Sequence, residues 1–140
     1  MVRDDVVAIV KAAYNDFQTG NIPALLGRLA DNVVWETPGA GTQIPYAGRL
    51  HGKDGVAGFF QSLGATAEFH RFDTNEFITN AAGDTVVVLG EWDATVIPTG
   101  VRVTSKFAMV FRLRDGKIAD FFEYSDSRSL ADAFAAPAKR

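Results

Sequence analysis

The sequence predicts an α+β fold, with helices in the first half of the chain and strands in the second. Apolar residues recur every three or four positions up to about residue 65, which is the period of a helix that covers a core. From about Glu68 the period changes to two, as in strands. The segments "NAAGD", "PTG" and "RDG" separate the strands, and connections this short join antiparallel neighbours. Helices followed by a run of strands are typical of the α+β class.

Three helices are expected before the run of strands. Val6, Val10, Tyr14 and Phe17 follow one another at spacings of four, four and three, so they share one helix face. A short second helix follows, in which Pro23 suits a first-turn position. The third helix is "KDGVAGFFQSLG". Its internal glycines lower helix stability by about 1 kcal/mol each, so tertiary packing must hold this helix.

Five segments have the composition of strands. The first, "NVVWET", lies between the second and third helices and is rich in residues that favour strands. The others are "EFHRFDTNEFIT", "DTVVVLGEWDATVI", "VRVTSKFAMVFRL" and "KIADFFEYSD". The segment "SRSLADAF" is expected to form a short closing helix. With no linker and no internal repeat, residues 1–140 are expected to form a single domain.

Composition excludes several classes of function. The chain has 140 residues, of which 47% are hydrophobic and 22% charged, as in an ordinary packed domain. It contains no cysteine and only two histidines, which argues against disulfides, thiol nucleophiles and a metal site. A net charge of -3 without basic clusters argues against nucleic acid. No phosphate-binding glycine motif, signal peptide or membrane span is recognisable, so we expect no cofactor and a cytoplasmic location without membrane contact.

The last strands leave the choice of buried face open. In residues 85–97 one alternate set contains Glu91 and Asp93, and the other contains Trp92. In the final strand one set holds Glu123 and the other holds Phe122 and Tyr124. If the helices cover the sets with the acids, Trp92, Phe122 and Tyr124 form an exposed apolar patch, and such patches usually meet a partner. We therefore expect a homodimer through the outer face of the sheet.

Three segments resemble proteins of the nuclear transport factor 2-like superfamily, in particular SnoaL-like polyketide cyclases and ketosteroid isomerases. They are "AAYNDFQTGNIPALLGRLADNVVWETPG", "IPYAGRLHGKDGVAGFF" and "LRDGKIADFFEYSD". The similarity extends over nearly the whole chain, from residue 6 to residue 134. It implies a cone-shaped (cystatin-like) fold in which three N-terminal helices pack on a curved, mainly antiparallel sheet around a cavity. The loop over residues 38–48 would frame the entrance, with Trp35 and Tyr46 as wall or gate.

Comparison with ketosteroid isomerases assigns three positions. Such enzymes use an aspartate base, with a tyrosine and a protonated aspartic acid as hydrogen-bond donors. The resemblance places Tyr14 at the position of the tyrosine. Thr37 lies at the position of the base and Met109 at that of the protonated acid. Because neither residue can take over the missing carboxyl, the sequence argues against steroid isomerase activity.

Limonene epoxide hydrolases suggest a different pair of acids. They place an arginine and an aspartate on one strand and a second aspartate on the last strand. The resemblance matches Asp93 and Glu123 to the two acids, with Glu91 in place of the arginine. If all three faced the cavity, mutual repulsion would favour protonation of at least one carboxyl. Alternatively, a single β-bulge would turn these acids to the outer face, where they would pair with bases such as Arg102.

The resemblance implies a cofactor-free acid/base enzyme that acts on a small hydrophobic molecule: an isomerase, cyclase, dehydratase or epoxide hydrolase. Glu123 and Asp93 would move the proton, with Tyr14 as hydrogen-bond donor. His70 could add an acid/base group, although an edge histidine is the commoner situation. The alternative is a non-catalytic module that binds a hydrophobic ligand or dimerises. The expected substrate-binding residues are Trp35, Thr37, Tyr46, Phe59, Phe60, Glu91, Phe107, Met109 and Phe121.

Overall fold

The computed structural model describes residues 3–139 and confirms the predicted α+β fold. Three helices precede the main run of strands: α1 (Arg3–Gln18), α2 (Ile22–Gly27) and α3 (Gly52–Thr66). The strands are β1 (Leu29–Thr37), β2 (Gly48–His51), β3 (Ala67–Thr79), β4 (Thr85–Val96), β5 (Val101–Arg114) and β6 (Lys117–Ser125). Helix α4 (Ser127–Ala135) closes the chain. Among the described residues, no helix is long and apolar enough to cross a membrane.

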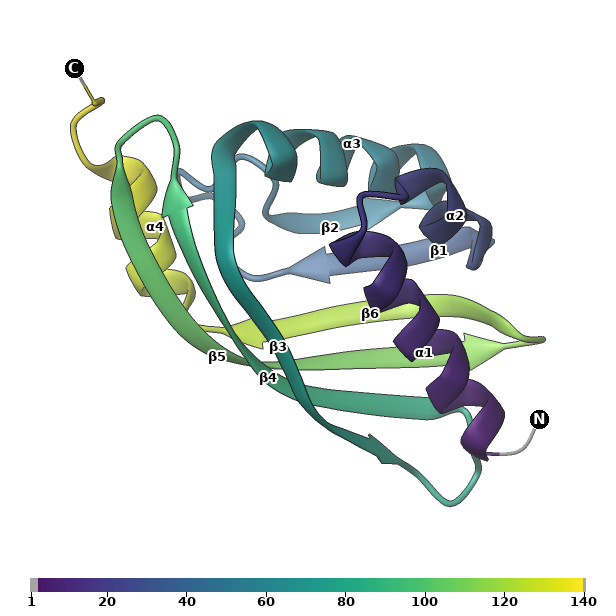
Figure 1. Cartoon of the computed structure of the whole chain (residues 1–140). Helices are drawn as coiled ribbons and strands as arrows, with labels where there is room; N and C mark the ends of the chain where they lie inside the picture. The colour runs from purple at the N-terminus through teal and green to yellow at the C-terminus, as the bar shows by residue number, and fades with distance from the viewer. Residues whose placement is uncertain (1–2, 140) are drawn as a thin grey trace.

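All six strands form one sheet in the order β2-β1-β6-β5-β4-β3. Within residues 3–139, β1 and β6 pair in parallel, and the other neighbouring strands are antiparallel. The long strands β3, β4 and β5 bend strongly, and helices α1, α2 and α3 cover the concave face (Figure 1). The predicted curved, mainly antiparallel sheet under three N-terminal helices is therefore confirmed.

Strand β2 was not predicted from the sequence. It has four residues, two of which, Arg49 and His51, are strongly polar, so it lacks an apolar run that would distinguish it from a loop. The strand forms because it pairs with β1, where Leu50 lies opposite Trp35. This pairing holds both ends of the loop over residues 38–47 beside the same strand.

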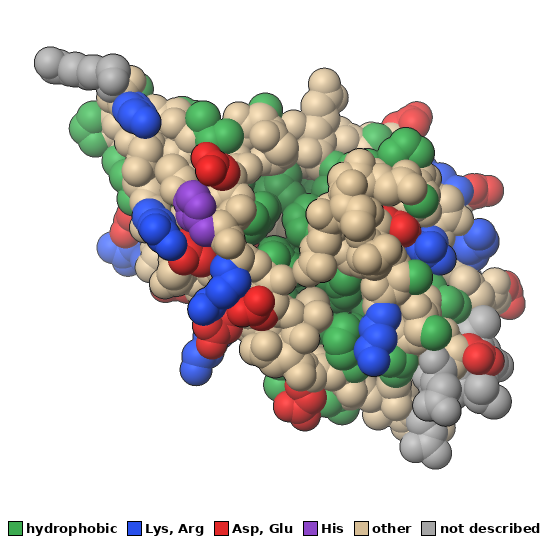
Figure 2. Space-filling model, viewed as in Figure 1, with side chains coloured by type: hydrophobic (Ala, Val, Ile, Leu, Met, Phe, Trp, Pro, Cys, Tyr) green, Lys and Arg blue, Asp and Glu red, His purple; other side chains and the backbone are tan. Residues whose placement is uncertain are grey.

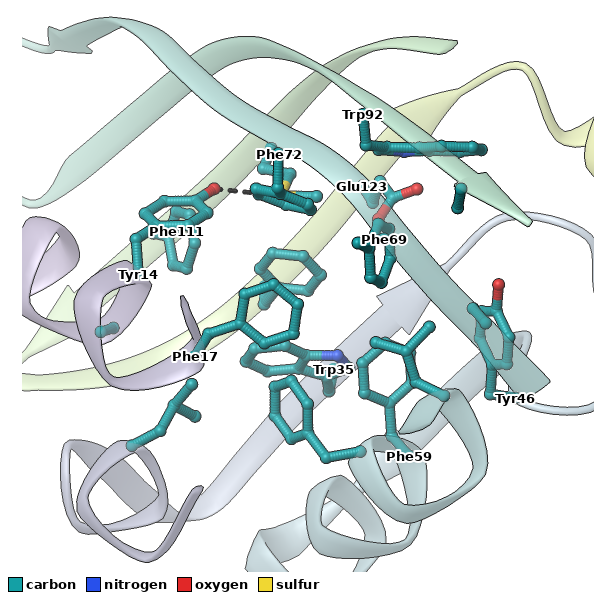
Figure 3. Close-up of a pocket in the computed structure, with 18 of the residues that line it drawn as sticks. Tyr14, Phe17, Trp35, Tyr46, Phe59, Phe69, Phe72, Trp92, Phe111 and Glu123 are labelled. Atoms are coloured by element: carbon teal, nitrogen blue, oxygen red, sulfur yellow. Dashed lines mark hydrogen bonds between the residues drawn. The ribbon is translucent and has the colours of Figure 1, made fainter. Parts of the chain in front are cut away.

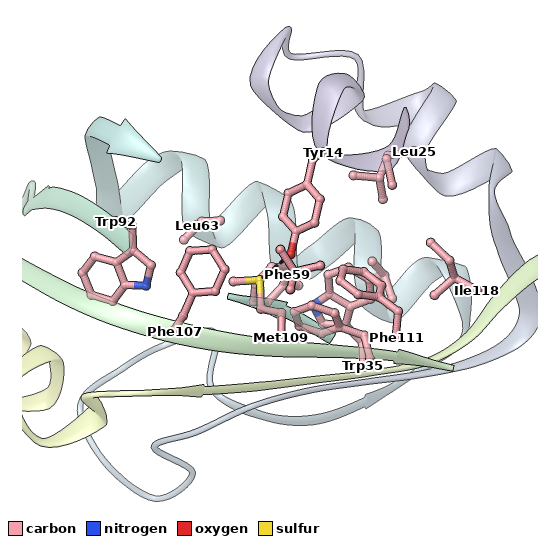
Figure 4. Close-up of a cluster of buried hydrophobic side chains, with 14 of the residues drawn as sticks. Tyr14, Leu25, Trp35, Phe59, Leu63, Trp92, Phe107, Met109, Phe111 and Ile118 are labelled. Atoms are coloured by element: carbon pink, nitrogen blue, oxygen red, sulfur yellow. Dashed lines mark hydrogen bonds between the residues drawn. The ribbon is translucent and has the colours of Figure 1, made fainter. Parts of the chain in front are cut away.

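The concave face carries one continuous apolar core. Figure 4 shows Tyr14 and Leu25 from the helices above side chains such as Trp35, Met109 and Phe111 from the sheet. These side chains are at most 8% exposed. Strand β5 contributes every second residue to this core, as the period of two predicts.

The face that β4 turns toward the helices is opposite to the expected one. Buried and half-buried positions alternate without interruption along β4, and the buried set contains Val88, Gly90, Trp92 and Ala94. Trp92 is 4% exposed. The expectation that Glu91 and Asp93 point inward and Trp92 outward is therefore wrong. Burying the uniformly apolar set removes more apolar surface from water than burying the set with two carboxylates.

Because Trp92 is buried under the helices, it is not part of the expected dimer patch. Phe122 and Tyr124 do lie on the outer face of β6, and Tyr124 is 63% exposed. A homodimer through this face remains a prediction, which sedimentation at micromolar protein concentration checks. A dimer that Tyr124→Glu dissociates is the expected result, and a monomeric wild-type protein would contradict it.

Candidate active site in the hydrophobic cavity

A cavity of about 80 Å³ lies between the helices and the concave face of the sheet. It opens as a hollow lined by hydrophobic side chains on the face seen in Figure 2. An apolar cavity of about 150 Å³ is known to hold benzene, so a ring-sized ligand of this protein must also fill part of the opening. The cavity wall is formed by side chains from helices α1, α2, α3 and α4, from strands β1, β3, β4, β5 and β6, and from the loop before β2.

Stacked and edge-on aromatic rings give the wall its shape. The Trp35 indole stacks on Phe121 from the neighbouring strand, with ring centroids 4.0 Å apart and an interplanar angle of 18°. Phe59 and Phe60 of α3 pack against the same indole with centroid distances of 5.7 and 5.6 Å. Aromatic pairs in such arrangements contribute beyond their buried area. The wall is therefore an apolar surface of closely packed aromatic rings.

Glu123 is the only acidic side chain within residues 3–139 that lines this cavity. It lies on β6 two residues after Phe121, so both side chains point to the concave face. Part of its surface faces the cavity, and the protein encloses the rest. Burial raises the pKa of Glu123 because it disfavours the charged carboxylate. The Ser125 hydroxyl donates a hydrogen bond of 2.7 Å to Oε2 of Glu123, which opposes this rise only in part.

Two tyrosines occupy different parts of the cavity (Figure 3). Tyr14 comes from α1, and its hydroxyl donates to the Sδ atom of Met109 over 3.0 Å. Tyr46 comes from the loop between β1 and β2 and lies on the same side of the cavity as Glu123. Burial, and secondarily the negative charge of Glu123, raises the pKa of both tyrosines. Both hydroxyls therefore stay protonated and can donate hydrogen bonds.

The structure brings together most, but not all, of the residues that the sequence singled out. Thr37 is buried but is not part of the cavity wall, and its hydroxyl donates to the Tyr46 carbonyl oxygen over 3.5 Å. Phe107 is buried against Phe72, outside the cavity wall. The predicted residues that do line the cavity are Tyr14, Trp35, Tyr46, Phe59, Phe60, Met109, Phe121 and Glu123.

Asp93 and Glu91 lie on the opposite face of the sheet. Nε and Nη2 of Arg102 donate to the two carboxylate oxygens of Asp93 over 2.8 and 2.7 Å. This hydrogen-bonded pairing lowers the pKa of Asp93. Arg71 donates to Glu91 over 2.7 Å. The alternative of outer-face acids paired with bases is therefore correct for Asp93, although the register between β4 and β5 is unbroken, so no bulge between these two strands turns Asp93 outward.

His70 also lies away from the cavity. Its side chain is exposed on β3, with Nε2 2.7 Å from the hydroxyl oxygen of Thr95. This agrees with an ordinary edge histidine. Within residues 3–139, no group of three His, Asp or Glu side chains is arranged to hold a metal ion.

Sequence reasoning missed several aromatic wall residues. Phe69 and Phe72 of β3 both line the cavity, although they are three positions apart. A register shift between Phe69 and Arg71 breaks the period of two and turns both rings inward. Trp92 also lines the cavity, although the sequence analysis assigned it to the outer face. The signal for the inner face was that the other residues at alternate positions with Trp92 along β4 are all apolar.

The fold and the cavity define a class: α+β proteins of the nuclear transport factor 2-like type, in which a curved sheet and three helices surround an apolar cavity. Residues 10–121 match the SnoaL-like domain. The chain belongs to the SnoaL-like domain family.

Three solved structures have the same fold over nearly the whole chain. An NTF2-like protein of Burkholderia xenovorans LB400 is 26% identical and superposes with a TM-score of 0.86 over 96% of this chain and 98% of that one. An NTF2-like protein of unknown function from Burkholderia pseudomallei K96243 is 28% identical, with a TM-score of 0.84 over 94% and 98%. TerC, co-crystallised with polyporic acid, is 23% identical, with a TM-score of 0.80 over 94% and 99%. No curated protein matches the chain.

Proposed function

We propose that this protein catalyses a cofactor-free proton transfer on a small, largely apolar organic molecule, with Glu123 as the group that moves the proton. The observation that carries the proposal is one acidic side chain, with a pKa raised by burial, on the wall of an aromatic cavity. A carboxylate that has lost most of its water is a stronger base than one in solution. A raised pKa also brings the group closer to neutral pH, where it can both accept and return a proton.

Because Glu123 supplies one carboxyl to the cavity wall, reactions that need a pair of acids are disfavoured. Epoxide opening of the limonene epoxide hydrolase type uses two acids, and here Asp93 is held by Arg102 on the other face of the sheet. One acid/base group is sufficient for reactions in which a proton leaves one carbon or oxygen atom and returns to another. We therefore favour isomerisation, cyclisation or dehydration over epoxide hydrolysis. Membership of the SnoaL-like family supports this choice.

A non-catalytic ligand-binding role is the second candidate, because the same aromatic wall would hold a hydrophobic molecule without any reaction. Its support is the predominance of ring side chains over polar groups around the cavity. The two candidates differ in whether the Glu123 carboxyl is needed for turnover or only occupies space.

A generic substrate for buried bases tests the proposal. In 5-nitrobenzisoxazole, a base removes the ring C–H proton, the N–O bond breaks as the nitrile forms, and a coloured nitrophenolate results. We expect saturable turnover above the buffer rate that rises with pH as Glu123 ionises. Because general base catalysis contributes about 100-fold or more, Glu123→Gln should lower kcat/KM by at least about 100-fold. Absorbance of the phenolate is the measurement.

Asp93→Asn is the matched control, because it neutralises a carboxylate of the same sheet that faces away from the cavity. It should leave kcat/KM within about twofold of the wild-type value. If the wild-type protein binds the compound but reacts no faster than Glu123→Gln, the proposal is wrong and the ligand-binding role stands.

A further inference from the structure

The hydroxyl groups of the two cavity tyrosines differ in how they are bonded. The Tyr14 hydroxyl already donates to the thioether of Met109. Among the hydrogen bonds of residues 3–139, none involves the Tyr46 hydroxyl, although Tyr46 lines the cavity. Nε1 of Trp35 is the one side-chain nitrogen or oxygen within residues 3–139 that is sealed from solvent without a partner, so the unpaired Tyr46 hydroxyl is not sealed and a solvent-sized molecule can reach it. A hydrogen-bond donor that lines an apolar cavity and has no acceptor in the protein needs an acceptor atom from a molecule that enters the cavity.

The ring of Tyr46 is held firmly, so its hydroxyl has a defined direction. Phe59 packs against it edge-on at a centroid distance of 5.5 Å and an angle of 88°. Phe134 of α4 packs against it at 6.0 Å and 74°. The loop that carries Tyr46 is anchored by Ile44, which is 4% exposed. A group positioned before the ligand arrives loses little freedom on binding, which favours specific recognition.

Tyr46 also lies on the side of the cavity where the proposed chemistry would occur. In Figure 3 the Tyr46 hydroxyl and the Glu123 carboxyl lie in the same half of the cavity, whereas the Tyr14 hydroxyl reaches Met109, which pairs with Glu123 across β5 and β6. Because burial and the charge of Glu123 raise the pKa of Tyr46, its hydroxyl keeps its proton. It can therefore donate to a neutral acceptor oxygen of a molecule that also contacts Glu123.

We propose that the Tyr46 hydroxyl donates a hydrogen bond to an acceptor oxygen of the ligand, so that the cavity selects ring compounds with a carbonyl-type oxygen over hydrocarbons of the same shape. The inference extends the proposed function, since it names the substrate class of the same cavity, but its evidence concerns binding alone. It moves the donor role from Tyr14, where the resemblance to ketosteroid isomerases places it, to a residue of the entrance loop.

The test compares 1-indanone with indane, which share a fused-ring skeleton and differ by one carbonyl group. Both tryptophans of the chain line the cavity, so their two indole N–H signals in a ¹H–¹⁵N spectrum report binding of either compound. For each protein we take the ratio of the dissociation constants of indane and 1-indanone, and we compare this ratio between the wild-type protein and each variant. Hydration of the two free compounds is the same in every measurement, so it does not affect the comparison. A neutral hydrogen bond corresponds to about a fivefold change in affinity.

Tyr46→Phe should therefore reduce the preference for 1-indanone about fivefold, and Tyr46→Leu, which also lacks the hydroxyl, should reduce it similarly. Tyr14→Phe is the matched control, since it removes the same atom from a hydroxyl that is already bonded, and should leave the ratio unchanged. An unchanged ratio in both Tyr46 variants overturns the inference, as does a loss of preference in Tyr14→Phe instead. Failure to detect binding of either compound to the wild-type protein also overturns it.

The outcome is separable from that of the proposed function. The indanone comparison measures affinity and requires no turnover, whereas the benzisoxazole assay measures the Glu123-dependent rate. A preference that survives in Tyr46→Phe would leave the role of Glu123 standing. A Glu123→Gln variant that reacts like the wild-type protein would leave the Tyr46 hydrogen bond standing.

Discussion

Gly90→Ala is expected to lower the free energy of unfolding by about 3 kcal/mol or to prevent folding, since overpacking of a filled core costs about 1–3 kcal/mol and more where the backbone obstructs. Gly90 lies in the middle of β4 on the buried face. A Cβ atom at this position would lie 2.0 Å from the carbonyl oxygen of Asp73 and 2.5 Å from Cζ of Phe107. The first neighbour is backbone, so no change of rotamer relieves the contact. Urea denaturation measures the loss.

Gly58→Ala is the control for this prediction. Gly58 lies inside α3, and nothing lies within 4 Å of the position of an added Cβ atom. Because alanine favours a helix over glycine by about 1 kcal/mol, this variant should be as stable as the wild-type protein or more so. If Gly90→Ala lowered the free energy of unfolding no more than Gly58→Ala does, the result would contradict the close approach of β3 to β4 at Gly90.

Gly90 matters for the site because it lies where β3 departs from regular pairing. Thr74 pairs with Gly90, and the register of β3 shifts between Thr74 and Glu76. Bulges of this kind increase the bend and twist of a strand. The absence of a side chain at Gly90 allows the Phe107 ring to lie there and support Phe72, which lines the cavity. A single glycine thus contributes to the curvature that makes room for a ligand.

Local periodicity was sufficient to predict the α+β class and most of its elements, whereas the cone shape was inferred from the family resemblance. The helix face from Val6 to Phe17 and the turn segments between strands specify which elements form and which neighbours are antiparallel. The parallel pairing of β1 with β6 did not follow from local signals, because it joins strands separated by most of the chain. That pairing places Trp35 beside Phe121 and brings the first and last strands into one cavity wall.

The candidate site was predictable in part, and the errors have a physical cause. On β4 the alternate set with Val88, Trp92 and Ala94 is apolar throughout, and simple hydrophobic alternation would have buried it. The resemblance to epoxide hydrolases pointed to Asp93 instead, and this orientation was wrong because two charged side chains would have had to be buried. On β6 both alternate sets contain aromatic residues, and there the inward orientation of Glu123 agrees with the structure.

The Phe69–Phe72 pair could not be predicted from period alone. Three positions separate the two residues, so a regular strand would place them on opposite faces. The register shift that brings both inward depends on how β3 pairs with β4 across the whole bend. The same shift lets Arg71 reach Glu91 on the outer face. Such irregular positions arise from the shape of the sheet as a whole, and here they add two aromatic rings to the cavity wall.

Glu123→Gln is expected to make the protein more stable at neutral pH and to leave its stability unchanged in acid. The folded protein raises the pKa of Glu123, so between the ordinary and the raised value the folded state binds more protons than the unfolded state. Wild-type stability therefore falls as pH rises through this window, by about 1.4 kcal/mol for each unit of pKa elevation. Glutamine has the same shape and no charge, and its side-chain oxygen can still accept from Ser125. Melting temperatures measured from acid to mildly alkaline pH would show the two proteins diverge.

Asp93→Asn is a control for which we expect the opposite change in stability at neutral pH. Pairing with Arg102 lowers the pKa of Asp93, so its ionised form stabilises the folded state above the ordinary pKa of aspartate, and this stabilisation is lost as pH falls through the lowered value. The variant should therefore be less stable than the wild-type protein at neutral pH. Equal destabilisation of Glu123→Gln at all pH values would contradict a penalty for the buried carboxylate. If the carboxyl of Glu123 lowers stability in this way, packing does not explain its place on the wall of an aromatic cavity, and the proposed proton transfer would account for it.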